Sequence, residues 1–317
     1  MVTLKDVAAS AGVSLATASR VVNGKGSVTR ASKEKVEKAI AELGYFSNEV
    51  ARGLRQDYLN LIAVTLPSIG NPFFSEMLQG IDDVISTEGY CVLFNNTTGD
   101  EAVQKQSLRN IRSYGIAGSI VYHLGSLDES LVQLCDAGFY CNIVSAVPQE
   151  NVRKVEFFHY DVAKIIQMAI QHVIQVGAEE IWLFAPLSDS TLYIQEETIA
   201  SLPCQLHIVF ANESTRDAYK LCEQHAISGT NTACITVNDL LAQGIINYQN
   251  ERAVRFPIIS VGNSSVAKNS LPPISSVGPS GYQIGVSIAR NLLSKIENTA
   301  SQLPVLQLLT PTLVTRN

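Results

Sequence analysis

Hydrophobic positions in the first 45 residues recur at helical spacing on either side of a glycine turn. The segment 4–9 is amphipathic, Ala11-Gly12-Val13 forms a short turn, and a second helix is expected over 15–23. Two short helices around a three- or four-residue glycine turn make a helix-turn-helix. Ser14 is placed to cap the second helix by accepting from backbone N–H groups. One side of that helix is expected to pack on the first helix through Val13, Ala18, Val21 and Val22.

The pattern next predicts a third helix and then a weak one. The third helix is expected to begin after Thr29 as its N-cap and to end at Gly44 as its C-cap. One face of this helix is expected to be buried through Val36, Ala39, Ile40 and Leu43. Asn48 starts a helix of about eight residues, which is marginal in water. Gly53 within it costs about 1 kcal/mol relative to alanine. We expect this segment to fold only when DNA and a second copy of the chain support it.

From Leu59 onward, short apolar runs alternate with amphipathic stretches. Alternating strands and helices predict a doubly wound parallel sheet, and some 250 residues exceed one such sheet, so we expect two lobes. Expected strands are 59–65, 90–95, 116–122, 140–144, 155–160, 181–184, 206–210, 233–236 and 258–261. Expected helices are 73–86, 101–114, 127–137, 161–175, 214–226 and 238–249.

Composition fits a folded protein of two or three domains, with 46% hydrophobic and 16% charged residues among 317. The net charge of −6 divides unevenly, because residues 1–60 carry nine basic and six acidic side chains, a net +3, which leaves −9 for the rest. A basic head on an acidic body is typical of a small DNA-binding module carried by a larger domain. The second helix is about as long as a major groove is wide, so we interpret it as DNA-reading.

The sequence predicts no enzyme, no cofactor and no metal site. No phosphate-binding loop, nucleophile elbow or histidine pair at metal-ligand spacing occurs. The adjacent acids Asp82-Asp83 and Glu179-Glu180 are interpreted as surface, Trp182 as core, and the scattered cysteines as buried thiols. His159 is the one histidine that we consider a candidate residue of a cleft. No run of about 18 apolar residues is present, and we expect a cytoplasmic protein, associated with the nucleoid when bound to DNA.

Residues 3–55 resemble the headpiece and hinge of the lactose-repressor/galactose-repressor family of bacterial transcription regulators. The runs Leu4-Lys5-Asp6-Val7-Ala8, Ala11-Gly12-Val13-Ser14 and 16–23 carry this resemblance. It implies a recognition helix in the major groove and paired hinge helices in the minor groove, where Leu54 wedges a base step and Val50 faces its mate. Leu15 and Ala16 hold the positions that most often choose the operator, and Ser47 replaces the usual proline. Implied DNA-binding residues are Thr3, Ser14, Leu15, Ala16, Thr17, Ser19, Arg20, Asn23, Ser27, Asn48, Ala51, Arg52, Leu54 and Arg55.

The resemblance continues through 68–74, 238–244 and 259–273, and implies a core like periplasmic sugar-binding proteins. Expected domains are a headpiece at 1–46, a hinge at 47–58 and a core at 59–317. Lobe one would span about 59–159 and 279–305, including a helix at 280–294, and lobe two about 160–278 and 306–317. Ligands of open α/β sheets bind beyond the carboxyl ends of the strands. Expected effector-binding residues are therefore Asn71, Phe73, Tyr122, Phe157, Ser188, Tyr193, Gln195, Asn238, Asp239 and Asn263.

Departures from the family leave the effector open. No arginine lies between Pro186 and Arg216, where sugar-binding members carry one, and Gln195 falls at or near that spot. An aspartate near 140–145 is missing, and Asn263 is assigned to the usual aspartate of the V-G-F/Y-D-D run. We expect a repressor of a carbohydrate-utilisation operon, acting as a homodimer or homotetramer on a palindromic operator, with a sugar in the cleft shifting the population of lobe arrangements. The alternatives are control by a protein partner or by a nucleoside or purine, and a sugar-binding protein without DNA function, against which residues 1–55 argue.

Overall fold

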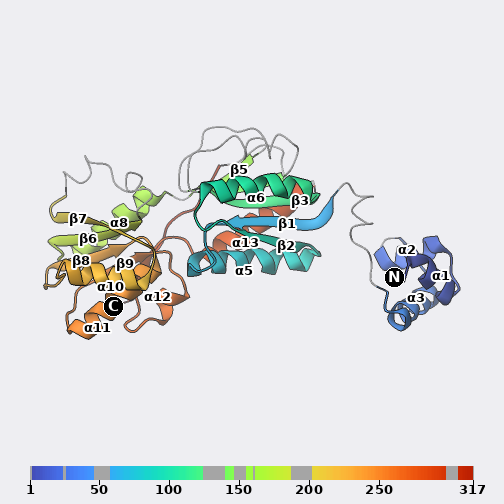
Figure 1. The fold of residues 1–317 in the computed structure, drawn as a ribbon, viewed down its shortest axis with the longest axis horizontal. Coiled ribbons are helices and arrows are strands. Elements are labelled where there is room, and N and C mark those ends of the chain that lie inside the picture. Colours follow the sequence, from blue (N-terminus) through green and yellow to red (C-terminus); the bar gives the residue numbers. More distant parts are fainter. Residues whose placement is uncertain are drawn as a thin grey trace. The chain divides into compact units, whose positions relative to one another are not determined.

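The computed structural model describes residues 2–23, 26–45, 58–123, 140–145, 155–159, 161–186, 202–297 and 306–316. Contacts divide the chain into two compact units, Met1–Leu59 and Asn60–Asn317 (Figure 1). The expected hinge helix at 47–58, apart from Tyr58, and the expected helix at 127–137 lie outside the described residues.

The first unit is a three-helix head, as the hydrophobic spacing predicts. Its helices are α1 (Leu4–Ala11), α2 (Leu15–Asn23) and α3 (Arg30–Leu43). Gly12 and Gly44 end α1 and α3 with φ of +64° and +60°, a left-handed conformation that glycine adopts without a Cβ penalty. The three helices share one core of Val7, Ala8, Ala11, Ala18, Val36 and Ala39. Val13 and Val21 pack at its edge as expected, whereas Val22 is half-buried outside this cluster.

The second unit begins with a six-stranded parallel sheet in the order β11-β5-β4-β3-β1-β2. Helix α6 packs on one face, where Leu108 and Ile111 meet Val121 and Ile143. Helices α5 and α13 pack against each other and cover the other face (Figure 1). The elements are β1 (Leu59–Leu66), α5 (Pro72–Ile85), η1 (Ser86–Glu88), β2 (Cys91–Asn96), α6 (Glu101–Ser113), β3 (Ile116–His123), β4 (Tyr140–Ser145), β5 (Val155–His159), α13 (Gly281–Ile296) and β11 (Leu306–Leu308).

A second six-stranded sheet has the order β12-β10-β9-β8-β6-β7, parallel except for the pair β10 and β12. Helices α10 and α11 share a core with Phe184, Val209 and Cys234 of this sheet, and α8 contacts β8, β9 and β10. The elements are α8 (Val162–Gln175), β6 (Glu180–Pro186), β7 (Gln205–Ala211), α10 (Thr215–Gln224), β8 (Thr232–Thr236), α11 (Asp239–Arg252), β9 (Ile258–Val261), α12 (Ser265–Asn269), β10 (Ser275–Val277) and β12 (Leu313–Val314). The predicted fold class, a helical head with two parallel-sheet lobes, is confirmed.

One predicted boundary is wrong. We expected the chain from residue 306 to belong to lobe two, but Leu306–Leu308 pairs with Phe157–His159 of the first sheet. Only β12, after a second crossing, joins the second sheet. The physical reason is that β5 would otherwise end its sheet with a row of unpaired backbone groups, which β11 covers. The short elements α12, β10 and β11 are absent from the sequence-based prediction, whereas a C-terminal strand in lobe two, which β12 supplies, was expected.

Helices α5 and α13 approach each other closely enough to require glycine at the crossing. A Cβ added to Gly285 would lie 2.2 Å from the carbonyl oxygen of Met77, and one on Gly281 would lie 2.2 Å from that of Phe73. On the facing helix, a Cβ on Gly80 would lie 2.3 Å from the carbonyl oxygen of Tyr282. These contacts fix the start of α5, and with it Asn71 and Phe73, against the rest of the lobe.

Candidate DNA-reading and effector sites

The start of α2 is held by the side chain that the sequence singled out. The Ser14 hydroxyl accepts from the backbone nitrogen of Thr17 at 3.1 Å, and the hydroxyls of the two residues lie 2.9 Å apart. These bonds use the N-cap geometry that satisfies an otherwise unpaired helix N–H group. The predicted cap is therefore confirmed, and the first turn of α2 has a fixed direction.

The outward side of α2 carries the expected mixture of short, polar and basic groups. Leu15 is 45% exposed, Ala16 and Arg20 are exposed, and Thr17 and Ser19 are half-buried. The aliphatic part of Arg20 packs over Gly26, since a Cβ built there would lie 3.5 Å from Arg20 Cδ. This contact steadies the arginine while its guanidinium stays at the surface, as a base- or phosphate-reading group requires.

The other expected DNA-binding residues are less fully described. Ser27 is exposed, and Thr3 forms a capping box in which its hydroxyl donates to the Asp6 carboxylate at 2.7 Å and accepts from Asp6 N. Hydrogen bonds that the Thr3 backbone nitrogen, at 2.8 Å, and the Thr3 hydroxyl donate to the Asp6 carboxylate hold its pKa below the usual value. The side chain of Asn23 is not described, and the five hinge residues Asn48, Ala51, Arg52, Leu54 and Arg55 lie outside the described ranges.

The basic side chains of α3 are exposed to solvent. Lys33 and Lys38 each lie 3.7 Å from a glutamate one helical turn later, Glu37 and Glu42 respectively. Exposed pairs at this spacing contribute only a few tenths of a kcal/mol. Because these glutamates offset the positive charge of the two lysines, α3 is a weaker candidate for DNA contact than α2.

In the second unit, two of the expected effector residues start helices in different lobes. Asn71 caps α5 after β1 of the first sheet, with Oδ1 accepting from Phe73 N at 3.1 Å. Asn238 caps α11 after β8 of the second sheet, with Oδ1 accepting from Leu241 N at 3.0 Å. Both residues are buried, and each cap leaves the amide nitrogen free to turn toward another acceptor.

That shared acceptor is Glu213, a residue that the sequence analysis did not single out. Its Oε2 accepts from Asn71 Nδ2 at 3.2 Å and from Asn238 Nδ2 at 2.9 Å. Glu213 follows β7 by two residues, just as Asn238 follows β8, so the rule that ligands bind beyond strand carboxyl ends also covers it. Glu213 was not among the expected effector residues, because it falls between the predicted strand 206–210 and the predicted helix 214–226 and carries no motif.

The Glu213 carboxylate is exposed, yet the groups around it compensate its negative charge only in part. The residue is exposed to solvent, yet surrounding protein raises the pKa of its carboxyl, while the hydrogen bonds from Asn71 and Asn238 act to lower it. The raised pKa means that neighbouring protein groups partly shield the carboxylate from water. Although the arginine and the aspartates expected from the family are missing, a carboxylate lies between the two caps.

Asp239 and Asn263 are engaged in a neighbouring network of the second lobe. Buried Asp239 accepts from Ser264 N at 2.7 Å and from the Ser260 hydroxyl, and burial raises the pKa of its carboxyl. The Asn263 side-chain oxygen accepts from the Arg316 guanidinium, which also donates to Ile274 O at 2.7 Å. These bonds connect the loop after β9 to α11 and to the end of the chain. Both residues therefore support the neighbouring site residues through contacts within the second lobe.

The sequence assignment of Asn263 needs a correction of one position. Along V-G-F/Y-D-D, Val261 and Gly262 align with the first two letters, so Asn263 takes the aromatic position and Ser264 the first aspartate. Ser264 is buried, and its hydroxyl accepts from Val266 N at 3.3 Å as the N-cap of α12. A serine supplies the cap that an aspartate would otherwise supply.

The aromatic residues divide between the site and the core. Phe73 is half-buried, and its ring carbon Cδ2 lies 3.9 Å from where a Cβ on Gly262 of the second lobe would be. Tyr122 is buried with its ring edge-on to Phe74 at 4.7 Å between centroids. Phe157 lies in the middle of β5 within the hydrophobic core, so the structure places it away from the strand ends where we expected it.

A further contact joins the lobes beside these residues. The backbone nitrogen of Ser265, at the start of α12, donates to Glu76 of α5 at 2.6 Å. Ser188, Tyr193 and Gln195, the remaining expected effector residues, lie outside the described ranges, and His159 is buried at the end of β5. Asn71, Phe73, Glu213 and Asn238 therefore form the described part of the candidate effector site.

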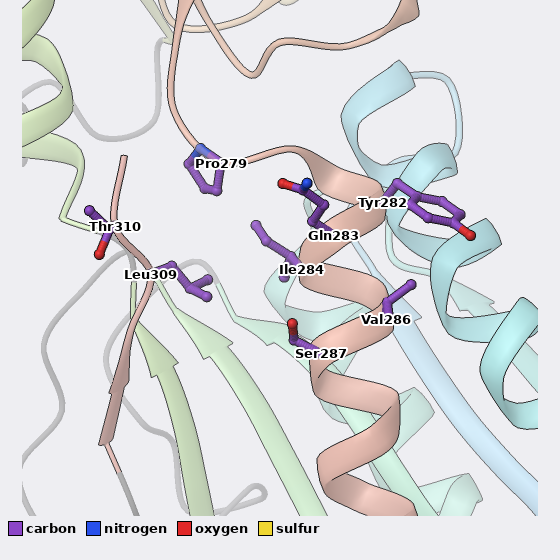
Figure 2. A pocket seen from close by; sticks show the side chains of 8 residues that line it. All are labelled: Pro279, Tyr282, Gln283, Ile284, Val286, Ser287, Leu309 and Thr310. Carbon is purple, nitrogen blue, oxygen red and sulfur yellow. The ribbon is translucent and has the colours of Figure 1, made fainter. Parts of the chain in front are cut away.

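A hollow lies along α13. It has a volume of about 450 Å³ and is lined by Pro279, Tyr282, Gln283, Ile284, Val286, Ser287, Leu309 and Thr310 (Figure 2). Figure 2 shows Ile284 and Leu309 on facing segments, with Tyr282 directed away from Leu309. Its lining contains none of the expected effector residues.

Other chemistry in the described ranges is structural. No group of three or more histidine, cysteine or acidic side chains there could hold a metal ion, and no helix in those ranges is long and apolar enough to cross a membrane.

Cys141, Cys222 and Cys234 are buried as predicted, and burial raises the pKa of the Cys222 thiol to about 12. Cys91 is exposed, contrary to the prediction, and Cys135 is not described. Trp182 stacks on His207 at 4.2 Å beside the core of the second lobe.

Comparison with known proteins gives matches at both ends of the chain. The family described as bacterial regulatory proteins, lacI family, matches residues 3–48, and the periplasmic binding protein-like domain matches residues 170–317. Catabolite control protein A of Staphylococcus xylosus is 28% identical over 94% of this chain and 93% of its own. The ribose operon repressor of Bacillus subtilis is 28% identical over 96% of each chain. A crystal structure of the lac repressor dimer, bound to operator and the anti-inducer ONPF, has a TM-score of 0.79 at 22% identity and covers 99% of this chain and 98% of its own.

Proposed function

Because the chain belongs to the lacI family of bacterial DNA-binding transcription regulators, we propose that it represses a carbohydrate-utilisation operon under the control of a sugar. The observation that carries the proposal is a capped helix, α2, whose exposed side presents Leu15, Ala16 and Arg20 from a glycine-turn helix-turn-helix. As a regulator, the chain is not an enzyme. It acts in the cytoplasm, on the nucleoid when bound to operator.

DNA reading is assigned to α2 and the hinge. Leu15 and Ala16 contact base edges through methyl groups, Arg20 and Ser19 supply hydrogen bonds, and Leu54 wedges a minor-groove step. The surrounding contacts to phosphate or bases come from Thr3, Ser14, Thr17, Asn23, Ser27, Asn48, Ala51, Arg52 and Arg55. A homodimer presents two such heads to a palindrome, with half-sites about one helical turn or a multiple of it apart. The crystal structure of the lac repressor, a dimer bound to operator, supports this arrangement.

Effector control is assigned to the strand ends of the second unit. A sugar needs acceptors and donors for its hydroxyls and an aromatic face for its C–H groups. Asn71, Asn238 and Glu213 supply the first and Phe73 the second, with Ser188, Tyr193, Gln195, Asp239 and Asn263 as further members. Ligand binding shifts the population of lobe arrangements and so changes the affinity of the heads for the operator. The ribose operon repressor among the relatives favours a sugar over a protein partner or a purine.

Selection from a random duplex library tests the DNA-binding half of this proposal. The full chain is expected to enrich a palindromic sequence, and fluorescence anisotropy with that duplex should show binding that weakens steeply with salt, because phosphate contacts release counterions. A scrambled duplex of equal composition is the control. Enrichment of no common sequence, or equal affinity for both duplexes, would contradict a sequence-specific regulator.

A further inference from the structure

The carboxylate of Glu213 lies where the N-termini of two helices from different lobes meet. Its Oε2 accepts from the capping asparagines of α5 and α11 at 3.2 and 2.9 Å. Helix N-termini carry partial positive charge and favour anions, through both the helix dipole and their unpaired N–H groups. At this junction the anion belongs to the protein itself.

The rest of the geometry leaves Glu213 able to receive a ligand. Among the described residues, its other oxygen, Oε1, has no hydrogen-bond donor, and the residue is exposed. The raised pKa of its carboxyl shows that the two amides do not fully replace the hydration lost there. A carboxylate in this condition gains from any further donor, whether a hydroxyl or an ammonium group, and repels a second anion.

We propose that Glu213 is a built-in anion that sets the charge class of the effector, so that the site accepts neutral or cationic compounds rich in donors and refuses phosphorylated or acidic ones. This inference rests on the proposed function only in placing the effector beside Asn71 and Asn238. It names the class of ligand, a polyhydroxy compound without an anionic group, that the sequence leaves open.

Binding of inorganic phosphate to the full chain tests the inference without knowledge of the natural effector. Glu213→Ala removes the resident anion and leaves room between the two caps, whereas Glu179→Ala removes an exposed carboxylate elsewhere and is the matched control. Phosphate-dependent shifts of the unfolding temperature, repeated at constant ionic strength with chloride, give the affinities. We expect Glu213→Ala to bind phosphate at least about tenfold more tightly than the wild type and the control. Equal phosphate affinity in all three proteins would overturn the inference.

A matched pair of sugars, glucose and glucose 6-phosphate, tests the same point with the side-chain volume kept. Calorimetry with Glu213→Gln, which removes the charge but keeps the shape, should show the ratio of glucose 6-phosphate to glucose affinity rising at least about tenfold over the wild type. If neither sugar binds, the phosphate result alone decides. If the wild type binds glucose 6-phosphate better than glucose, the proposed role of Glu213 is refuted and the proposed regulator function is unaffected. If the full chain binds no operator, only the proposed function is refuted. Circular dichroism establishes that each variant is folded. If only one of Glu213→Ala and Glu213→Gln folds, the experiment with that variant tests the inference.

Discussion

Asn71 and Asn238 cap helices that follow strands of different sheets, yet their amide nitrogens donate to the same oxygen of Glu213, at 3.2 and 2.9 Å. Each asparagine uses its side-chain oxygen for the cap, at 3.1 and 3.0 Å, and its side-chain nitrogen for the bond to Glu213, so one amide makes both contacts. The helix starts of both lobes are thereby coupled through one carboxylate. A ligand that changes the contacts of Glu213 acts on both lobes together.

The coupling between Asn71 and Glu213 is measurable in a double-mutant cycle. Asn71→Ala alone is expected to cost about 1 kcal/mol of unfolding free energy for the lost cap. With Glu213→Ala added, the two effects should differ from additivity by about 1 kcal/mol, because the hydrogen bond to a charged group is counted in both single variants. Urea unfolding of the four proteins gives the value. A cycle of Asn71 with exposed Glu179 should be additive, and additivity in both cycles would contradict the cross-lobe bond.

Glu213 should also give the second unit a pH-dependent stability of definite sign. Its folded pKa is raised above the ordinary value of 4.5, so the folded state binds the proton more tightly than the unfolded state. Stability from this group therefore increases as pH falls from neutral through the folded pKa, and levels off below the ordinary value. Glu213→Gln should remove that increment. The test is the difference between the pH profiles of the two proteins in urea unfolding, since Asp239, also with a raised pKa, titrates in both. Identical profiles would show that Glu213 is not desolvated.

The glycine crossing of α5 and α13 predicts a strong effect of one methyl group. Gly285→Ala would place a Cβ 2.2 Å from Met77 O, so the helices must separate or distort. Overpacking of this kind costs about 1–3 kcal/mol. Ser287→Ala, exposed two residues later on α13, is the matched control and should change the unfolding free energy by less than about 0.5 kcal/mol. Equal stability of the two variants would show that the helices are not in backbone contact.

The capping box of α1 makes the head sensitive to acid. Bonds from the Thr3 backbone and hydroxyl hold the folded pKa of Asp6 below its usual value of 3.8. Their contribution is present above that value and is lost as pH falls through the lower, folded pKa. Hydrogen exchange of residues 4–11 in the full chain should therefore accelerate in that acidic range, after correction for intrinsic rates. Asp6→Asn should abolish the acceleration. Retention of it in the variant would assign the acid sensitivity to another group.

Arg20 is expected to carry a larger part of operator binding than any lysine of α3. Arg20→Ala should weaken binding to the selected duplex and, if the contact is to phosphate, reduce the salt slope by about 1. Lys33→Ala is the control because Glu37 already pairs with that lysine, and its effect should be small. Anisotropy titrations at several salt concentrations separate the two. A larger loss from Lys33→Ala would move the DNA-reading surface to α3.

Local sequence signals predicted the elements well where one residue decides the geometry. Gly12 and Gly44 take left-handed conformations at the helix ends, and Ser14 and Thr29 supply side-chain caps, because these requirements act over three or four residues. The alternation of apolar runs likewise predicted β1 to β9, but it missed the short strands β10 and β11. The residues of β11 were assigned to the wrong lobe because a three-residue strand carries no pattern that identifies its partner; the unpaired edge of β5 decides it.

The candidate effector site shows the same division. Asn71 and Asn238 were found because a strand end followed by a capping residue is visible in the sequence. Glu213 was missed because its importance comes from a contact with Asn71, 142 positions away. Phe157 was expected in the site although the predicted strand 155–160 already placed it in mid-strand; its side chain belongs to the core that α6 and the sheet share, a contact between segments far apart in the sequence.

Operator affinity of the full chain, measured by anisotropy with and without each of a panel of neutral sugars, tests most directly whether the second unit controls the first. For at least one sugar that calorimetry shows to bind, the dissociation constant for the selected palindrome should change by about tenfold or more, the usual range of allosteric coupling. Sugars that bind the protein and leave operator affinity unchanged would contradict the account.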